Sequence, residues 1–266
     1  MMESGVFPEK RYSQNFLVDD EAVADLVSSA GIRKGDHILE IGGGTGIVTQ
    51  ALADTPAQIT CVEFHHSLAD YLKKKFADRK DITIIEDDFL HLNLSTIPFT
   101  KVVASPPYAI SDDIMYSLFA HGFSRASMIW QLEFAEKILS PPGSGEYHPL
   151  SVIGQYFFDG EIKRKVSPKS FYPIPNHFSA LLLINRRPKA VRFDDYPIFV
   201  QWLKTIFRFK NKTVNNAVSQ MEKNPVKGMD MQGSKDAIRD SELSEEKVFL
   251  LEPEEFVELF EMITQK

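Results

Sequence analysis

The chain has 266 residues, of which 43% are hydrophobic and 25% charged, a composition typical of a globular protein with one or two domains. No apolar run approaches the roughly 18 residues that span a bilayer, and the polar N-terminus lacks the apolar core of a signal peptide. A single cysteine, Cys61, excludes an internal disulfide. These features favour a protein of the reducing cytoplasm, with Cys61 packed inside a buried strand.

From His37 onward, short apolar runs alternate with helical stretches, a pattern typical of a mostly parallel sheet with helices on both faces. The five expected strands are residues 37–41, 58–63, 82–85, 101–104 and 127–130. Two later runs, 152–165 and 180–185, have no long helix between them and are expected to pair antiparallel at the end of the sheet. The predicted fold class is therefore α/β, doubly wound and Rossmann-like, with an antiparallel end.

The composition changes after Arg186-Arg187-Pro188, and from Pro197 onward the pattern is helical, with apolar residues at three- and four-residue spacing. Residues 223–236 contain proline and glycines and are expected to form an exposed loop. A last helix is expected to begin near Glu252, because proline and acidic residues favour a first helical turn. We therefore predict a catalytic domain of residues 1–189 and a small helical domain of residues 190–266.

Basic residues are concentrated in one part of a chain whose net charge is −7. Between residues 161 and 212, twelve Lys or Arg face only three Asp or Glu. The twelve are Lys163, Arg164, Lys165, Lys169, Arg186, Arg187, Lys189, Arg192, Lys204, Arg208, Lys210 and Lys212. Such a segment can follow a phosphate backbone, although a solvated charged face is the alternative.

A glycine-rich loop, residues 40–46, follows the first expected strand and leads into a helix. Glycines let the backbone approach a ligand closely, and the N–H groups at a helix start can donate to it. The spacing of Gly42, Gly44 and Gly46 differs from the G-x-G-x-x-G of dinucleotide sites. Glu40 would repel a pyrophosphate but suits the positively charged amino-acid end of S-adenosylmethionine. The loop therefore predicts that cofactor, with a flavin or nicotinamide as the competing assignment.

An acidic residue also ends the second expected strand, and another follows the third. Glu63 can accept hydrogen bonds from both ribose hydroxyls, and Asp88 can accept one from the adenine amino group. A strand-end cap would explain any one of these acids. Three successive strand ends with suitable groups instead predict a cofactor site, which Ser105 at the fourth strand end is expected to join.

The motif Ser105-Pro106-Pro107-Tyr108 follows the fourth strand, at the edge where open α/β sheets bind ligands. An aromatic exocyclic amine is a poor nucleophile because its lone pair is delocalised into the ring. Ser105 Oγ and the Pro106 carbonyl could accept its two N–H groups, and Tyr108 could stack on the extruded base. Without the glycine loop, a rigid turn would be the preferred interpretation. With it, the motif predicts methyl transfer to a base amine, catalysed mainly by placement.

With both motifs placed, the chain resembles the KsgA family of ribosomal RNA adenine dimethyltransferases, relatives of the erythromycin-resistance methyltransferases. Further matching segments are residues 10–17, 131–137, 147–151, 166–175 and 207–216. The resemblance implies a class I methyltransferase sheet and N6,N6-dimethylation of adenosine in small-subunit ribosomal RNA. It also implies that Asn15 and Leu17 help to hold S-adenosylmethionine and that Phe171 sandwiches the target base opposite Tyr108, with core filling as the alternative for Phe171.

RNA contacts are expected from Lys163, Arg164, Lys165, Lys169, Arg208, Lys210 and Lys212. We also expect a monomer without a metal ion that acts on a small-subunit precursor.

Three departures from the family pattern keep alternatives open. Ser105-Pro106-Pro107-Tyr108 replaces Asn-Leu-Pro-Tyr and is similar to the motif of enzymes that methylate the N4 amine of cytosine. Lys210-Asn211-Lys212-Thr213 replaces Arg-Arg-Lys-Thr, and Ser13 replaces a glycine. The alternatives are N4 methylation of cytidine in the same RNA and a non-catalytic ribosome assembly factor. A small-molecule methyltransferase would leave the basic segment unexplained.

Overall fold

A computed structural model describes residues 15–187, 196–221, 225–227, 229 and 231–264. The chain divides into two compact units, one of residues 1–136 and 159–186, the other of residues 137–158 and 187–266. The first unit carries the sheet, and the second unit is helical in its described part. The predicted boundary at 189/190 lies outside the described residues and stays a prediction. The sequence did not predict that residues 137–158 group with the C-terminal helices.

The first unit is built on a seven-stranded sheet with the order β4-β3-β2-β5-β6-β9-β7, beside a two-stranded ribbon, β1-β8. The strands are β1 (Phe16–Leu17), β2 (His37–Ile41), β3 (Gln58–Glu63), β4 (Ile82–Glu86), β5 (Lys101–Ala104), β6 (Arg125–Gln131), β7 (Phe158–Val166), β8 (Phe171–Tyr172) and β9 (Ser179–Arg186). Strands β2 to β6 are parallel, and β9 runs antiparallel to β6. The predicted α/β class with an antiparallel end is confirmed.

One strand prediction is wrong in its first half. Residues 152–157, expected as strand, belong to helix α6 (Pro149–Phe157), and only the following residues form β7. A reciprocal cap starts the helix, because the His148 side chain accepts from a first-turn N–H and Ser151 Oγ accepts from the His148 N–H at 3.1 Å. Since proline is also favourable in a first turn, this local signal outweighs the apolar pattern that suggested a strand.

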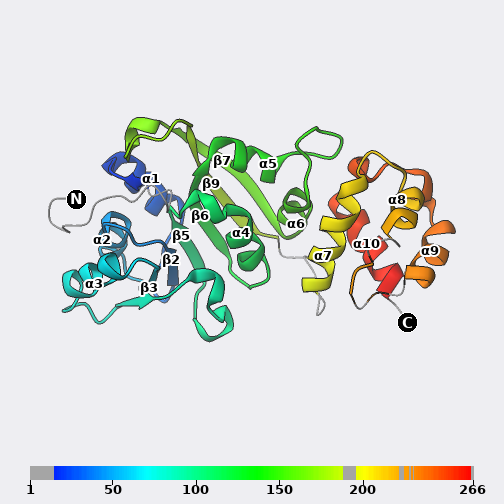
Figure 1. The fold of residues 1–266 in the computed structure, drawn as a ribbon. Helices are drawn as coiled ribbons and strands as arrows, with labels where there is room; N and C mark the ends of the chain where they lie inside the picture. Colours follow the sequence, from blue (N-terminus) through cyan, green and yellow to red (C-terminus); the bar gives the residue numbers. More distant parts are fainter. Residues whose placement is uncertain (1–14, 188–195, 222–224, 228, 230, 265–266) are drawn as a thin grey trace. The chain divides into compact units, whose positions relative to one another are not determined.

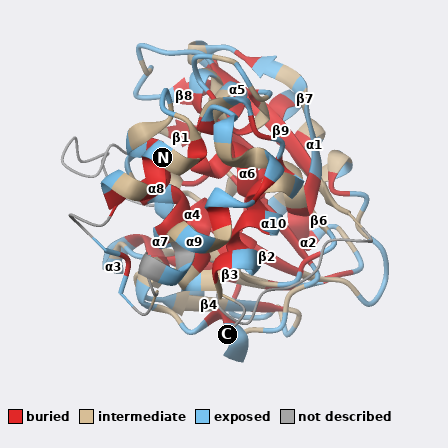
Figure 2. Ribbon diagram, turned by 90° about the vertical axis from the view of Figure 1, so that its right-hand side faces the viewer, coloured by how far each residue is buried: buried red, intermediate tan, exposed pale blue. Residues whose placement is uncertain are grey.

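Helices cover both faces of the sheet. They are α1 (Asp20–Ser29), α2 (Ile47–Ala53), α3 (His66–Lys75), α4 (Ser111–Phe119) and α5 (Leu132–Leu139). In Figure 1, α1, α2 and α3 lie together on one side of the sheet, and α4 lies on the other. Figure 2 shows the central strands in the colour of buried residues. The Cys61 thiol is free and fully buried on β3, as the sequence predicted.

The second unit has an aromatic core. Its helices are α6, α7 (Tyr196–Ile206), α8 (Val214–Met221), α9 (Met231–Arg239) and α10 (Pro253–Thr264). Phe199 of α7 packs edge-on against Phe260 of α10, with ring centroids 5.0 Å apart. The predicted helix starts near residues 197 and 252 are confirmed.

The exposed loop predicted for residues 223–236 is wrong from Met231 onward, where α9 begins. Gly233 lies inside this helix, although glycine costs a helix about 1 kcal/mol relative to alanine. Ile238, on the same helix, is fully buried, and α9 contacts both α8 and α10. Burial of apolar surface therefore outweighs the local propensity on which the prediction depended. Residues 223, 224, 228 and 230 lie outside the described part.

None of the helices in the described residues is both long and apolar enough to cross a membrane.

The glycine loop packs tightly against the strand and helix beside it. A Cβ at Gly43 would lie 2.4 Å from Cys61 Sγ and 2.7 Å from Leu72 Cδ1. Both neighbours are fully buried, so neither has free space into which to move. The absence of a side chain at residue 43 therefore lets the loop rest directly on β3 and α3.

We expect Gly43→Ala to lower the free energy of unfolding by about 1–3 kcal/mol, because the added methyl group overpacks the core. Urea unfolding of the two proteins measures the difference. Gly122→Ala is the matched control, since a Cβ at Gly122 would meet nothing within 4 Å. Equal unfolding midpoints for the Gly43 variant and the unmodified protein would contradict the tight packing.

Candidate active site

A cavity of about 390 Å³ opens in the first unit, within the size range of small-molecule sites. Its lining includes the ends of β2, β3 and β4 and the turn that follows β5. The predicted site residues that line it are Asn15, Gly42, Gly44, Glu63, Asp88, Ser105, Pro106 and Tyr108. The structure therefore brings the glycine loop, the strand-end acids and the Ser-Pro-Pro-Tyr turn together around one space.

The glycine loop has the backbone shape that favours glycine. Gly42, Gly44 and Gly46 have φ angles of +79°, +54° and +79°. The Gly42 N–H donates to the Val62 carbonyl at 2.8 Å, which ties the loop to the end of β3. A Cβ on Gly42 would point toward the proline turn, 3.4 Å from Pro107 Cδ. A side chain there would enter the space between the loop and the turn.

Glu63 is buried at the end of β3, and both of its carboxylate oxygens accept backbone hydrogen bonds. The Gly44 N–H donates to Oε2 and the His65 N–H donates to Oε1, each at 2.8 Å. Burial raises the pKa of Glu63, and the hydrogen bonds from Gly44 and His65 oppose this rise. Since each carboxylate oxygen can accept a second hydrogen bond, Glu63 is oriented by the backbone and can still accept from a ligand.

Asp88 follows β4 and begins a short 3-10 turn. Its Oδ1 accepts from the Leu90 N–H at 2.9 Å, which caps the turn and fixes the carboxylate beside the cavity. Asp88 thus both caps the turn and offers a hydrogen-bond acceptor at the third strand end.

Tyr108 is held at three points. Its hydroxyl lies 2.8 Å from Ser179 Oγ, and its carbonyl accepts from Ser111 Oγ at 2.7 Å. Its ring meets that of Phe171 edge-on, with centroids 6.4 Å apart and an interplanar angle of 72°. Burial raises the pKa of Tyr108 to about 12, so the phenol is neutral near pH 7. The ring is therefore a fixed, uncharged wall of the cavity.

The structure does not bring three of the predicted site residues to the cavity lining. Leu17 and Phe171 are paired across β1 and β8, and both side chains belong to the hydrophobic core. Glu40 is buried beside Thr49 and Cys61, and neither of its carboxyl oxygens has a hydrogen-bond partner among the described residues. The burial of Phe171 fits the core-filling alternative, and the roles in ligand binding assigned to all three remain predictions.

Sequence reasoning missed the apolar walls of the cavity, which include Phe16, Phe64 and Phe89. Each of these rings directly follows a polar residue that was predicted, in Asn15-Phe16, Glu63-Phe64 and Asp88-Phe89. Because both residues of each pair lie at a strand end, the polar and the apolar side chain can border the same space. This repeated pairing is the signal that could have found them.

The basic residues of the first unit differ in their ion pairs and exposure, and therefore in how accessible their charges are to a phosphate. Arg164 is half-buried and forms ion pairs with two carboxylates of α1, which raise its pKa. Lys163 pairs with Glu161 at 3.3 Å. Lys165 Nζ lies 4.1 Å from the centroid of the Phe178 ring. Lys169 is exposed. The ion pairs of Arg164 make it a link between β7 and α1 as well as a candidate RNA contact.

In the second unit, Arg208 and Lys212 are exposed, and Lys210 Nζ donates to the Gly145 carbonyl at 2.8 Å. Lys189, Arg192 and residues 10–14 of the N-terminal matching segment lie outside the described residues. The RNA contacts predicted for both units remain predictions.

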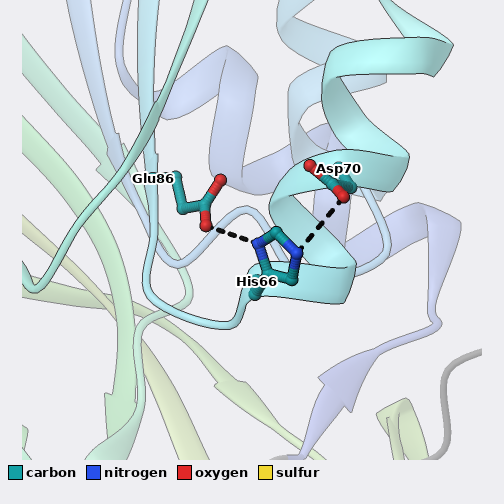
Figure 3. A group of neighbouring side chains, drawn as sticks. All are labelled: His66, Asp70 and Glu86. Atoms are coloured by element: carbon teal, nitrogen blue, oxygen red, sulfur yellow. Dashed lines mark hydrogen bonds and ion pairs between the residues drawn. The ribbon is translucent and has the colours of Figure 1, made fainter.

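A surface group of His66, Asp70 and Glu86 has possible ligand atoms within 4.8 Å of one another (Figure 3). His66 Nδ1 lies 2.6 Å from Glu86, and Nε2 lies 3.5 Å from Asp70. The Lys73 ammonium contacts the other oxygen of Glu86. Contact with Glu86 raises the pKa of His66, and Lys73 is the main cause that lowers the pKa of Glu86. We describe the group as an exposed ion-pair network, and the sequence analysis assigned none of its residues to a metal.

Comparison with known proteins gives a match over almost the whole chain. The family model for "Ribosomal RNA adenine dimethylase" matches residues 8–264. A probable ribosomal RNA small subunit methyltransferase A of Methanococcoides burtonii is 33% identical over 207 residues, covering 78% of this chain and 76% of the relative. The protein of the same name from Methanococcus vannielii is 30% identical over 253 residues, covering 94% of each chain.

Solved structures agree on the fold. A dimethyladenosine transferase from Plasmodium falciparum is similar with a TM-score of 0.78, at 22% identity over 92% of this chain and 95% of that one. The 23S rRNA methyltransferase ErmE is similar with a TM-score of 0.65, at 27% identity over 94% of this chain and 100% of that one. The predicted enzyme class and the resemblance on which it rested are confirmed. The chain belongs to the ribosomal RNA adenine dimethylase family.

Proposed function

We propose that this enzyme transfers two methyl groups from S-adenosylmethionine to the N6 amine of an adenosine in small-subunit ribosomal RNA. The observation that carries the proposal is the shared cavity, in which the glycine loop and strand-end acids face the same space as Ser105 and Tyr108. Membership of an adenine dimethylase family favours adenosine over the cytidine that Ser105 suggested.

The cavity fits the cofactor chemically. The backbone at Gly42 and Gly44 permits close approach, and Glu63 can accept from ribose hydroxyls while two N–H groups orient it. Asp88 offers an acceptor for the adenine amine, and the Phe64 and Phe89 rings supply apolar walls for a flat base. Bound in this cavity, S-adenosylmethionine would supply an activated methyl group.

The turn after β5 would prepare the amine. Ser105 Oγ and the Pro106 carbonyl accept its two N–H groups and draw the nitrogen toward a tetrahedral geometry, which frees its lone pair. Pro106 and Pro107 stiffen this turn, so little reorganisation is needed when the base arrives. Tyr108, fixed through Ser179, offers its ring for stacking on the extruded base. The amine proton leaves to water, and placement supplies most of the catalysis.

We further propose that the protein is a cytoplasmic monomer, that it uses no metal ion and that it acts on a small-subunit precursor. Lys163, Lys165 and Lys169 of the first unit would contact the RNA backbone, together with Arg208 and Lys212 of the second. Counterion release from the phosphates makes such contacts salt-sensitive.

Incubation of the protein with unmethylated small ribosomal subunits and labelled S-adenosylmethionine tests the proposal, with the modified nucleoside identified by mass spectrometry. We expect N6,N6-dimethyladenosine, and Tyr108→Ala should lower kcat/KM by about 5- to 150-fold through the loss of about 1–3 kcal/mol of stacking. Label in cytidine alone would overturn the adenine assignment. Absence of label, with normal RNA binding, would favour the assembly factor.

Gly42→Leu should weaken binding of S-adenosylhomocysteine by more than about tenfold, a loss of more than about 1.4 kcal/mol, because the side chain enters the cavity. Isothermal titration calorimetry measures this. Gly35→Leu is the matched control, since Gly35 also has a positive φ, +92°, but lies outside the cavity lining. The two variants share the backbone strain, so equal loss of affinity in both would show that strain alone is responsible.

Titration of Glu40 makes the stability of the folded protein depend on pH. Burial raises its pKa from 4.5 to about 8, so the folded state keeps a proton that the unfolded state releases. The stability that this protonation contributes is complete below pH 4.5 and is lost as pH rises toward about 8. In its protonated form the Glu40 carboxyl places no charge in the core.

Glu40→Gln removes this titration. We expect the free energy of unfolding of the unmodified protein to fall relative to that of the variant by up to about 1.4 kcal/mol per pH unit between these limits. Urea unfolding at several pH values compares the two proteins. If the difference in free energy of unfolding between the two proteins were the same at every pH, the buried, protonated state of Glu40 would be contradicted.

A further inference from the structure

We propose that Phe178 and Lys165 form a stacking site for a nucleotide next to the target base in single-stranded RNA. The inference rests on the proposed function and extends it from the reacting base to its neighbour. We call Phe178 with Lys165 the flanking-base site. No sequence motif pointed to Phe178.

The flanking-base site belongs to an exposed segment that is unusually apolar. The segment runs from residue 172, the last of β8, through the connection 173–178 to β9, and six of its seven residues are exposed. Tyr172, Ile174 and Phe178 are 49%, 64% and 47% exposed. Large apolar side chains exposed close together along one segment are typical of a place where another molecule binds.

The ring of Phe178 is paired with a cation that no carboxylate neutralises. Lys165 Nζ lies 4.1 Å from the ring centroid and forms no ion pair within the described ranges of the chain. No Asp or Glu occurs from residue 162 to residue 193. Lys163, on the same strand, is instead paired with Glu161. Lys165 thus combines a cation–π contact, which orients Phe178, with a charge that can meet a phosphate.

Phe178 is also coupled to the catalytic turn. Its carbonyl accepts from the Leu132 N–H at 3.0 Å, just beyond the end of β6. The next residue, Ser179, bonds the Tyr108 hydroxyl at 2.8 Å and pairs with Gln131 across β6 and β9. Phe178 is therefore the direct chain neighbour of Ser179, which makes the contact that fixes the proposed base-stacking ring of Tyr108.

These features fit a nucleotide better than a protein surface. A base offers a flat face for Phe178, and its phosphate offers an anion for Lys165, the two partners that single-strand sites combine. Extrusion of the target base also exposes a face of its neighbour in the stack. An apolar protein partner would leave the Lys165 ammonium without a counterion.

The test uses the full chain, with S-adenosylhomocysteine present, and single-stranded RNA oligonucleotides that carry 2-aminopurine next to one central adenosine. Stacking on Phe178 should quench the fluorescent base. We expect Phe178→Ala to abolish the quenching and weaken RNA binding by about 5- to 150-fold, and Phe178→Trp to preserve both. Leu250→Ala, which truncates a side chain of similar exposure, 45%, should leave both unchanged.

Salt titration tests the charge. Lys165→Met should reduce the slope of log affinity against log salt concentration by about 0.7, the value for one phosphate contact on a single strand. Lys34→Met, which removes an exposed lysine preceding β2, should leave the slope unchanged.

Unchanged RNA affinity and quenching in Phe178→Ala would overturn the flanking-base site, as would retention of the full salt slope in Lys165→Met. Wild-type protein that binds none of these oligonucleotides would overturn it too. Phe178-dependent RNA binding without methyl transfer to ribosomal subunits would instead count against the proposed reaction while supporting the stacking site.

Discussion

The interaction on which the site depends is the pair of hydrogen bonds that Glu63 accepts from the Gly44 and His65 N–H groups. It joins the end of β3 to the glycine loop that follows β2, so two strand ends share one carboxylate. Because Glu63 is buried, these bonds are made where water competes poorly, and the loop has one position. Both the loop and Glu63 line the cavity, so this junction helps to set its shape.

Much of the fold could be predicted because the central strands are buried on both faces and read as continuous apolar runs. Residues 37–41, 58–63 and 101–104 were predicted with the bounds that the structure shows. The errors arose where a local or tertiary effect opposed the pattern. The His148 cap favours helix α6 in a run that was expected to be a strand. Burial of Ile238 stabilises α9 although this helix contains a glycine.

The candidate site was predictable where its residues follow strands, because parallel strands bring their carboxyl ends to one edge. Gly42, Glu63, Asp88 and Ser105 all line the cavity for this reason. The direction of a side chain is set instead by pairing and packing, which one sequence does not reveal. Pairing of β1 with β8 turns Phe171 into the core, and the alternation of faces along β2 does the same for Glu40.

The burial of Cys61 has a practical consequence for work on this protein. It is the chain's single thiol, it is fully buried, and burial raises its pKa well above the usual range. Thiolate is the form that reacts with alkylating reagents, so the native protein should be nearly inert to maleimides while folded. A cysteine introduced on the surface of each unit would then accept dyes selectively, and energy transfer between them could report the separation of the two units as RNA binds.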